Sequence, residues 1–202
     1  MNQIKYVEGD LFGPLLADKE PGSIVVPHVA NSHGAWGAGF VVPLGRTFPK
    51  ARQEYIDWSK AVAIFSGERD EPSELVTFSL GETQIVEVQE AIGTRLHVMG
   101  EHEVPTNPQP SIHVCNMIAQ TLGGVRPLFY NHLARCLDTV AKFALKHNSR
   151  IVCPAFGAGL AGGSWIIIEK LIEDCWLRKG LSVTIYYLPG TLLEIESRPK
   201  VS

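Results

Sequence analysis

The chain lacks the features that mark membrane proteins, disulfide-rich secreted proteins and nucleic-acid-binding proteins. Its 202 residues contain no uninterrupted apolar run of membrane length, and the segment Met1 to Lys5 lacks the apolar core of a signal peptide. The four cysteines are widely spaced and form no C-x-x-C pair, so we expect reduced thiols in a cytoplasmic protein. The net charge is −3, without the basic excess that nucleic acids or anionic membranes attract. Any phosphate ligand should therefore be small and locally bound.

The composition is that of one globular domain over residues 1–202, with 45% hydrophobic and 19% charged residues. We interpret residues 66–110 as an irregular, β-rich elaboration on this domain, because the segment is thinly apolar and ends in a proline-rich link. Short antiparallel strands are predicted within it at 75–78, 84–88 and 95–99. Within it, His97 and His102 lie near two glutamates. Their spacing matches no zinc pattern, so we expect a solvated hairpin, no metal and no cofactor.

Strand-like and helix-like segments alternate along the rest of the chain. Short apolar runs predict strands at 4–7, 23–29, 112–118, 151–154 and 181–188. Apolar residues at spacings of three and four predict helices within 40–48, from Pro49, from Pro127, and from an N-cap at Ser164 to a stop at Gly180. This order predicts an α/β fold with three α/β/α layers and a mixed, largely parallel sheet.

Two glycine-rich loops directly follow predicted strands. The first, from His28 to Phe40, holds three glycines in six residues, and the second runs from Gly157 to Gly162. Bare backbone lets a ligand approach N–H groups closely, and a following helix N-terminus favours an anion. Since ligands of such sheets bind beyond the carboxyl ends of the strands, both loops should grip one ligand.

The second loop matches the G-x-G-x-x-G dinucleotide fingerprint, so an NAD-dependent Rossmann enzyme is one alternative. However, that fingerprint normally opens its domain and is followed by an acid at the end of the next strand. Here it lies late in the chain, and Leu181 to Leu188 contains no acid. A P-loop is excluded because neither loop is followed by Lys-Ser or Lys-Thr.

Three motifs together resemble a macro domain, the ADP-ribose-binding module. These motifs are Gly9-Asp10-Leu11 after the first strand, Asn31 before Gly34 to Gly39, and the late loop from Gly157 to Trp165. The resemblance covers nearly the whole chain apart from 66–110. The segments His28-x-x-Asn31, Gly34-x-Trp36-Gly37-x-Gly39 and Phe48 to Ala51 resemble the branch that contains ADP-ribose-1″-phosphate phosphatases.

This resemblance implies ADP-ribose or ADP-ribose-1″-phosphate as the ligand, or an ADP-ribosylated macromolecule as a partner. Asp10 would accept from the adenine amino group, although chemistry alone favours a cap on the next turn as the role of this residue. Asn31 would hold the distal ribose. The remaining implied ligand-binding residues are Leu11 and Tyr186 near the adenine, and Gly37, Ala38, Gly39, Phe40, Phe156, Gly157, Ala158, Gly159, Leu160, Ala161 and Gly162 around the diphosphate.

The implied catalytic residues are His28 and His33. In the macro-domain branch that removes ADP-ribose from glutamate, a lysine and an aspartate do the chemistry, but the matching positions here are Gln120 and Ala161, which supply no nucleophile or base. A neutral imidazole could instead activate water or protonate a leaving oxygen. Alternatively, His28 could be a structural residue at the end of a strand, with its hydrogen bonds satisfied within the protein. His33 could be a loop residue in contact with solvent or phosphate. The sequence thus predicts an ADP-ribose-1″-phosphate hydrolase, with a non-catalytic ADP-ribose reader as the alternative.

Overall fold

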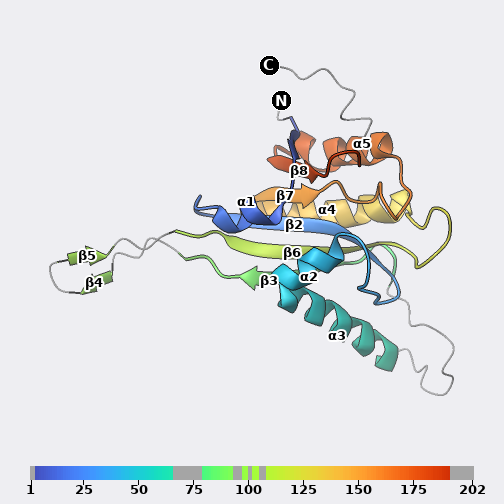
Figure 1. Ribbon diagram of the computed structural model, residues 1–202, viewed down its shortest axis with the longest axis horizontal. Coiled ribbons are helices and arrows are strands. Elements are labelled where there is room, and N and C mark those ends of the chain that lie inside the picture. The colour runs from blue at the N-terminus through green and yellow to red at the C-terminus, as the bar shows by residue number, and fades with distance from the viewer. Residues whose placement is uncertain (1–2, 66–78, 93–96, 100–101, 105–107, 192–202) are drawn as a thin grey trace.

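The computed structural model describes residues 3–65, 79–92, 97–99, 102–104 and 108–191. Its centre is a six-stranded sheet in the order β1-β8-β7-β2-β6-β3 (Figure 1). The strands are β1 (Lys5–Glu8), β2 (Ser23–Asn31), β3 (Thr83–Gln89), β6 (Ser111–Gln120), β7 (Ser149–Pro154) and β8 (Val183–Tyr187). All neighbouring strands are parallel except β3, which runs antiparallel to β6 at the edge. The predicted mixed, largely parallel sheet is confirmed.

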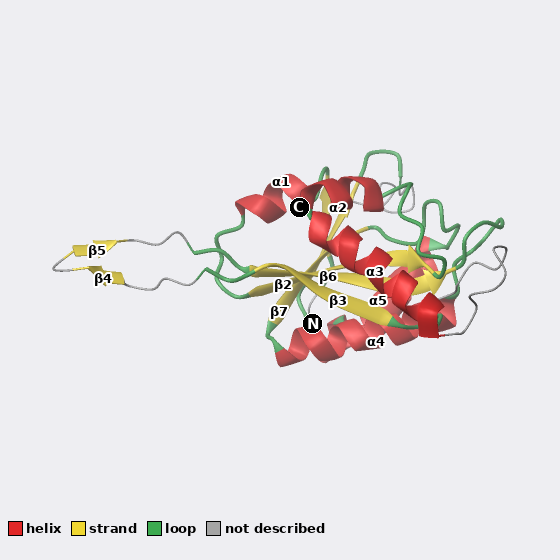
Figure 2. Ribbon diagram, turned by 90° about the horizontal axis from the view of Figure 1, so that it is seen from below, coloured by secondary structure: helices red, strands yellow, loops and turns green. Residues whose placement is uncertain are grey.

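Helices cover both faces of this sheet (Figure 2). One layer holds α1 (Phe12–Ala17), α2 (Val41–Thr47) and α3 (Pro49–Phe65), and the other holds α4 (Tyr130–Lys146) and α5 (Trp165–Cys175). Side chains of alternate residues in β2 pack against opposite helical layers. Val25 packs with α4 and α5, whereas Ile24 and Val26 pack with α1 and α2. Both faces of the central strands are therefore buried, as their continuous apolar sequence predicts.

The structure corrects several predicted boundaries. The helix expected from Pro127 begins only at Tyr130, because the N–H groups of Leu128 and Phe129 donate to Ala161 and Ala119 and tie this segment to neighbouring loops. The helix expected to end at Gly180 ends at Cys175. It is followed by a 3-10 turn, η1 (Leu177–Lys179), and the left-handed Gly180 ends that turn instead.

The segment 66–110 is described only in part. The strand predicted at 84–88 is β3, which forms the edge of the main sheet. Farther along, β4 (His97–Met99) and β5 (His102–Val104) pair as a separate antiparallel hairpin that stands away from the sheet (Figures 1 and 2). The strand predicted at 75–78 lies outside the described residues, as do the side chains of His97 and His102.

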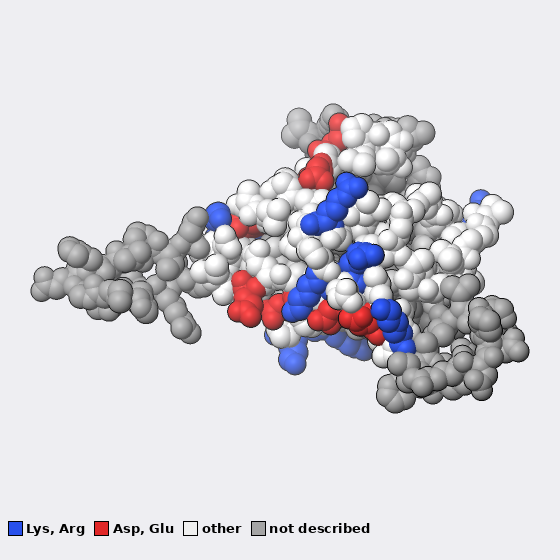
Figure 3. All heavy atoms as spheres, turned by 60° about the horizontal axis from the view of Figure 1, so that its bottom comes forward, with Lys and Arg blue, Asp and Glu red and all other residues white. Residues whose placement is uncertain are grey.

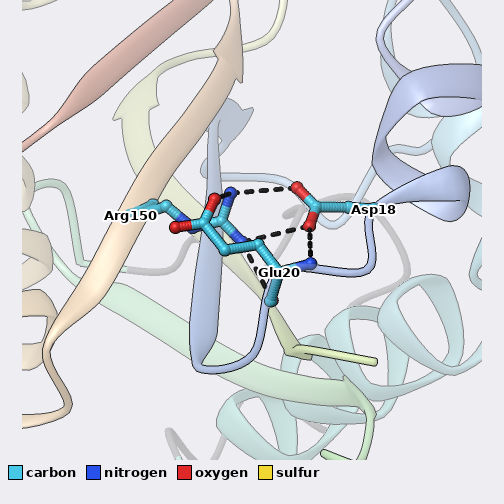
Figure 4. A network of polar contacts seen from close by, with 3 residues as sticks. All are labelled: Asp18, Glu20 and Arg150. Carbon is cyan, nitrogen blue, oxygen red and sulfur yellow. Dashed lines mark hydrogen bonds and ion pairs between the residues drawn. The ribbon is translucent and has the colours of Figure 1, made fainter. Parts of the chain in front are cut away.

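An ion-pair network ties the end of α1 to the start of β7 (Figure 4). The guanidinium of Arg150 donates to both carboxylate oxygens of Asp18, at 2.9 and 3.2 Å, and lies 2.9 Å from a carboxylate oxygen of Glu20. Partial burial raises the pKa of Asp18, but hydrogen bonds from Arg150 and from the Glu20 N–H outweigh this effect and hold the pKa below its ordinary value. Asp18 is therefore ionised at neutral pH and anchors α1 to the sheet.

The charged surface carries both signs. On the face drawn in Figure 3, basic and acidic side chains alternate rather than form one basic patch. None of the helices in the described part of the chain has the length and hydropathy of a membrane span. All four cysteines are free thiols, and Cys115, Cys136 and Cys153 are buried.

Candidate functional site

Loops that follow parallel strands gather at one edge of the sheet. The carboxyl ends of β2, β6 and β7 lie at the same edge, and the loops 32–40, 121–129 and 155–164 begin there (Figure 1). The Cδ1 atom of Leu160 lies 3.3 Å from the position that a Cβ on Gly39 would take. The two glycine loops therefore lie side by side, as the strand ends predict.

A cleft of two connected compartments lies between these loops. The first has a volume of about 440 Å³ and the second about 260 Å³. Gly39, Phe40, Pro154, Ala155 and Gly159 line both compartments and form their shared wall. Together the compartments have the size of a typical small-molecule site, on the order of 300–1,000 Å³.

Most of the predicted ligand-binding residues line this cleft. The first compartment contains Asp10, Leu11, Gly39, Phe40, Ala158, Gly159 and Tyr186. The second contains His28, Ala38, Gly39, Phe40, Phe156, Gly157, Gly159, Leu160 and Ala161. Four predicted residues line neither compartment: Asn31, His33, Gly37 and Gly162.

The side chain of Asn31 holds the backbone of the first glycine loop through hydrogen bonds. Its Oδ1 atom accepts from the N–H groups of His33 and Ala35, at 3.0 and 3.1 Å, and its Nδ2 donates to the Ala35 carbonyl at 2.6 Å. The buried hydroxyl of Tyr55 on α3 donates to the Asn31 carbonyl. Gly34 has φ +71° and packs on Ser59, where a Cβ would come within 2.8 Å. The loop is thus fixed to α3 before any ligand binds.

The second glycine loop is fixed by close backbone packing. The Gly163 N–H donates to the Gly157 carbonyl at 2.9 Å. A Cβ on Gly163 would lie 2.4 Å from Leu128 and 2.7 Å from the Gly157 oxygen, so only glycine fits. Gly162, with φ +65°, packs in the same way against the Val125 carbonyl. These glycines join the loop to the segment 125–128 rather than line the cleft.

Asp10 lies at the outer end of the first compartment. Its Oδ2 atom accepts from the N–H groups of Phe12 and Gly13, at 3.0 and 3.1 Å, and so caps the first turn of α1. The residue is exposed. Capping occupies one carboxylate oxygen, so Oδ1 can accept from a ligand. The two roles that the sequence left open for Asp10 are compatible in one side chain.

His28 lies beneath the second compartment and is 1% exposed. Its Nε2 lies 2.6 Å from Oδ1 of Asn116, and its Nδ1 lies 3.3 Å from the Val29 carbonyl oxygen. The rings of Trp36 and Phe40 pack against the imidazole. Burial lowers the pKa of His28 to about 4, so the ring is neutral at neutral pH.

His33 holds two loops together at the edge of the cleft. Its Nδ1 accepts from the Leu122 N–H at 3.3 Å and lies 3.1 Å from the Ser32 hydroxyl. The loop after β2 is thereby attached to the loop after β6.

Two further observations concern the residues available as nucleophiles or metal ligands. Gln120 and Ala161 line the second compartment at the two positions noted above. In the part of the chain that the structure describes, no group of three or more His, Cys, Asp or Glu side chains is arranged to hold a metal ion.

Sequence reasoning missed three kinds of residue. Pro154 and Ala155 line both compartments because they are the last residue of β7 and the residue after it, a position that the strand prediction could have supplied. Tyr55 belongs to the helix predicted from Pro49, but its hydrogen bond to Asn31 spans 24 residues of sequence, and no local pattern indicates it. The contact of Asn116 with His28 depends on the pairing of β2 with β6, for which no local signal exists.

Known structures share this fold over nearly its whole length. A macrodomain protein from Streptomyces coelicolor is 29% identical, with a TM-score of 0.62, and the match covers 91% of this chain and 98% of that one. A Bacteroides thetaiotaomicron protein of unknown function is 27% identical, with a TM-score of 0.66 and coverage of 93% and 99%. A Thermosipho africanus DarTG structure in complex with ADP-ribose is 18% identical, with a TM-score of 0.59, and the match covers 98% of this chain and 43% of that one.

Curated relatives match over shorter segments. The ADP-ribose 1″-phosphate phosphatase of Candida albicans is 32% identical over 79 residues, which is 36% of this chain and 49% of the relative. That of Lodderomyces elongisporus is 36% identical over 55 residues, or 27% and 33% of the two chains. The matches thus span half or less of these relatives' length. No protein-family model matches the chain.

The sheet order, the two helical layers and the cleft between two glycine loops define a macro domain. The macrodomain protein of Streptomyces coelicolor shares this architecture over nearly the full length of both chains, so the chain has the macro-domain fold.

Proposed function

We propose that this chain binds ADP-ribose or a close derivative in the two-compartment cleft and hydrolyses the terminal phosphate of ADP-ribose 1″-phosphate. The observation that carries the binding proposal is the position of the shared wall. Gly39 and Gly159, one from each glycine loop, line both compartments and leave bare backbone between the Asp10 end and the His28 end. A diphosphate between a base and a sugar has this linear arrangement.

The ligand would lie with its base in the first compartment. Leu11, Phe12 and Phe40 supply an apolar wall there, and Oδ1 of Asp10 would accept from the adenine amino group. The diphosphate would then meet the backbone of both glycine loops. The distal ribose would extend into the second compartment, towards Asn31 and His28. Asn31 would act through the loop that it organises and through its second Nδ2 hydrogen.

The hydrolytic proposal depends on His28. It is the titratable side chain among the described residues of the second compartment, and its imidazole can accept a proton from an attacking water while neutral, or donate one to the leaving ribose oxygen once protonated. Attack of that water on phosphorus would break the bond to the ribose oxygen, which would take up a proton to become a hydroxyl, and would release inorganic phosphate. The curated relatives that carry this activity in their names support the choice of substrate. We propose that His33 contributes by holding its loop in place.

The second candidate function is a reader that binds ADP-ribose without turnover. The specific observation in its favour is that Gln120 and Ala161 supply neither nucleophile nor base in the second compartment. The Rossmann alternative conflicts with the sheet order, since the β7 loop that carries the fingerprint is not the first turn of the domain.

Two measurements test the proposal. Calorimetry with ADP-ribose tests binding, and phosphate release from ADP-ribose 1″-phosphate tests hydrolysis. We expect His28→Ala to lose phosphate release, whereas the matched variant His147→Ala, at an exposed position after α4, retains it. Binding without release by the wild-type protein would support the reader, and failure to bind ADP-ribose would refute both candidates.

A further inference from the structure

A row of three polar side chains crosses the sheet from the cleft to α3. His28 of β2 lies opposite Asn116 of β6, and Asn116 lies opposite Gln84 of β3. Nε2 of His28 is 2.6 Å from Oδ1 of Asn116, and Nδ2 of Asn116 donates to Oε1 of Gln84 at 2.9 Å. The row ends where Nε2 of Gln84 donates to the Glu54 carbonyl of α3 at 3.0 Å.

The last contact of this row fixes the direction of every hydrogen bond before it. A backbone carbonyl can only accept, so Gln84 must present its NH₂ group to Glu54 and its oxygen to Asn116. Asn116 must then present its NH₂ group to Gln84 and its oxygen to His28. That oxygen also can only accept, so Nε2 of His28 carries the hydrogen. The neutral ring is therefore the Nε2–H tautomer, and its Nδ1 is unprotonated.

This tautomer leaves one contact of His28 unsatisfied. Nδ1 lies 3.3 Å from the Val29 carbonyl oxygen, which is a second acceptor. Each ring nitrogen therefore lies beside an acceptor oxygen, but the neutral ring has only one N–H group to donate. A second proton, on Nδ1, would satisfy both contacts. What opposes it is burial, which lowers the pKa of His28 to about 4.

The groups that face His28 carry no charge that would counter this effect. Asn116 faces it from β6, Trp36 from the glycine loop and Phe40 from the start of α2. Tyr55 of α3 packs on Trp36 and is neutral, because burial raises the pKa of its hydroxyl far above the ordinary value. Among the described residues of the second compartment there is no Asp, Glu, Lys or Arg. A bound diphosphate would therefore be the dominant charge near His28.

We propose that Asn116 and Gln84 are positioning residues that hold neutral His28 as the Nε2–H tautomer, and that binding of an anionic diphosphate ligand in the cleft is accompanied by proton uptake at Nδ1 of His28. The proton comes from the solvent buffer and forms the Nδ1–H bond, which donates to the Val29 carbonyl; no other bond changes. The second half of the proposal rests on the proposed binding of ADP-ribose. Opposite charges within about 4–6 Å raise a histidine pKa by about 1–3 units.

Calorimetry measures the uptake directly. ADP-ribose is titrated at pH 5.5 and pH 7 in MES and in bis-tris, whose different ionisation enthalpies report the number of protons exchanged. From a free pKa of about 4 raised by 1–3 units, we expect uptake of roughly 0.2 to 1 proton at pH 5.5 and less at pH 7. Adenosine, which is uncharged, should bind without uptake. His28→Gln should abolish the uptake, whereas the matched variant His147→Gln should keep it.

The tautomer is tested without any ligand. Long-range nitrogen–proton spectra of histidine-labelled protein at pH 7 should show His28 protonated at Nε2. Gln84→Ala frees the amide of Asn116 to rotate, so the Nδ1–H tautomer should become populated. Asn116→Asp places a carboxylate beside Nε2 and should raise the His28 pKa in the free protein, which would reduce the uptake on binding.

The outcomes separate the two proposals. ADP-ribose binding without proton uptake at pH 5.5 would overturn the coupling, although the proposed function would stand. An Nδ1–H tautomer in the wild-type protein, or an unchanged tautomer in Gln84→Ala, would overturn the role of the amide row. If ADP-ribose does not bind, the proposed function and the coupling both fail, and the nitrogen spectra still decide the role of Asn116 and Gln84.

Discussion

Replacement of Asp10 by asparagine separates the two tasks that the structure gives to this side chain. Oδ2 of Asp10 caps α1 through the N–H groups of Phe12 and Gly13. Asparagine is as good an N-cap as aspartate, so its oxygen should take over these two bonds. Its NH₂ group must then take the place of Oδ1, which is the oxygen proposed to accept from adenine. Asp10→Asn therefore keeps the cap and replaces an acceptor by a donor that faces another donor.

The expected magnitudes follow from these bonds. Loss of a hydrogen bond to a charged acceptor costs about 1.5–3 kcal/mol, which weakens ADP-ribose binding roughly 10- to 150-fold. The free energy of unfolding should change by less than about 0.5 kcal/mol. Asp10→Ala should weaken binding as well, but it also removes both capping bonds and should cost about 1 kcal/mol of stability. Calorimetry and urea unfolding on the two variants distinguish a lost ligand contact from a lost cap.

Replacing the adenine of the ligand by another nucleobase provides a sharper control for the contact with Asp10. In the hypoxanthine analogue of ADP-ribose, the amino group of the base is replaced by a carbonyl, which is an acceptor. Wild-type protein should bind this analogue less tightly than ADP-ribose, whereas Asp10→Asn should reverse the preference. If Asp10→Asn binds ADP-ribose within about threefold of wild type, less than the loss of one such bond would produce, Asp10 does not contact the base.

Four further predictions concern stability and charge. Gly163→Ala should lower the free energy of unfolding by about 1–3 kcal/mol in urea, because the new Cβ would overlap Leu128, whereas Gly159→Ala, whose Cβ meets no atom, should not. Asp18→Asn should cost about 1–2 kcal/mol at pH 7; the contribution of ionised Asp18 is present above pH 3.8 and is lost as the pH falls through its lowered pKa. Between pH 7 and pH 5 the wild-type protein should lose about 2 kcal/mol more than His28→Gln, because unfolded His28 gains a proton below pH 6.5 that the folded ring, with a pKa of about 4, does not. ADP-ribose affinity should change less than about threefold between low and physiological salt, since no Lys or Arg is among the described residues that line the cleft.

The sequence predicts the parts of this fold that depend on local pattern. Continuous apolar runs identify the central strands, and the glycine loops that follow them identify the edge of the sheet where the cleft lies. In contrast, α1 has six residues, including Gly13 and Pro14, and its apolar pattern is too short for a periodicity to be recognised. Its sequence signal is Asp10, which predicts a cap on the next turn but does not by itself predict a helix.

The polar interior of the site depends on register and could not be predicted in this way. The row from His28 through Asn116 to Gln84 requires β2 to pair with β6, and β6 with β3, at one particular residue of each strand. These residues are 88 and 32 positions apart in the chain. Strand prediction locates the segments but leaves their relative register free by several residues, and a shift by one residue would turn each side chain to the other face. The tautomer of His28 is therefore a property of the assembled sheet.

No basic side chain is among the described residues that line the cleft, so residues behind the lining should contribute strongly to the affinity for a diphosphate. If backbone N–H groups meet the diphosphate, then affinity depends on loop geometry, which is set by residues that do not line the cleft. Tyr55 holds the Asn31 carbonyl, and His33 joins its loop to Leu122. Each bond fixes several N–H groups at once, so its loss should act on the diphosphate more than on the base. A Tyr55→Phe protein should accordingly lose affinity for ADP-ribose while its affinity for adenosine is retained.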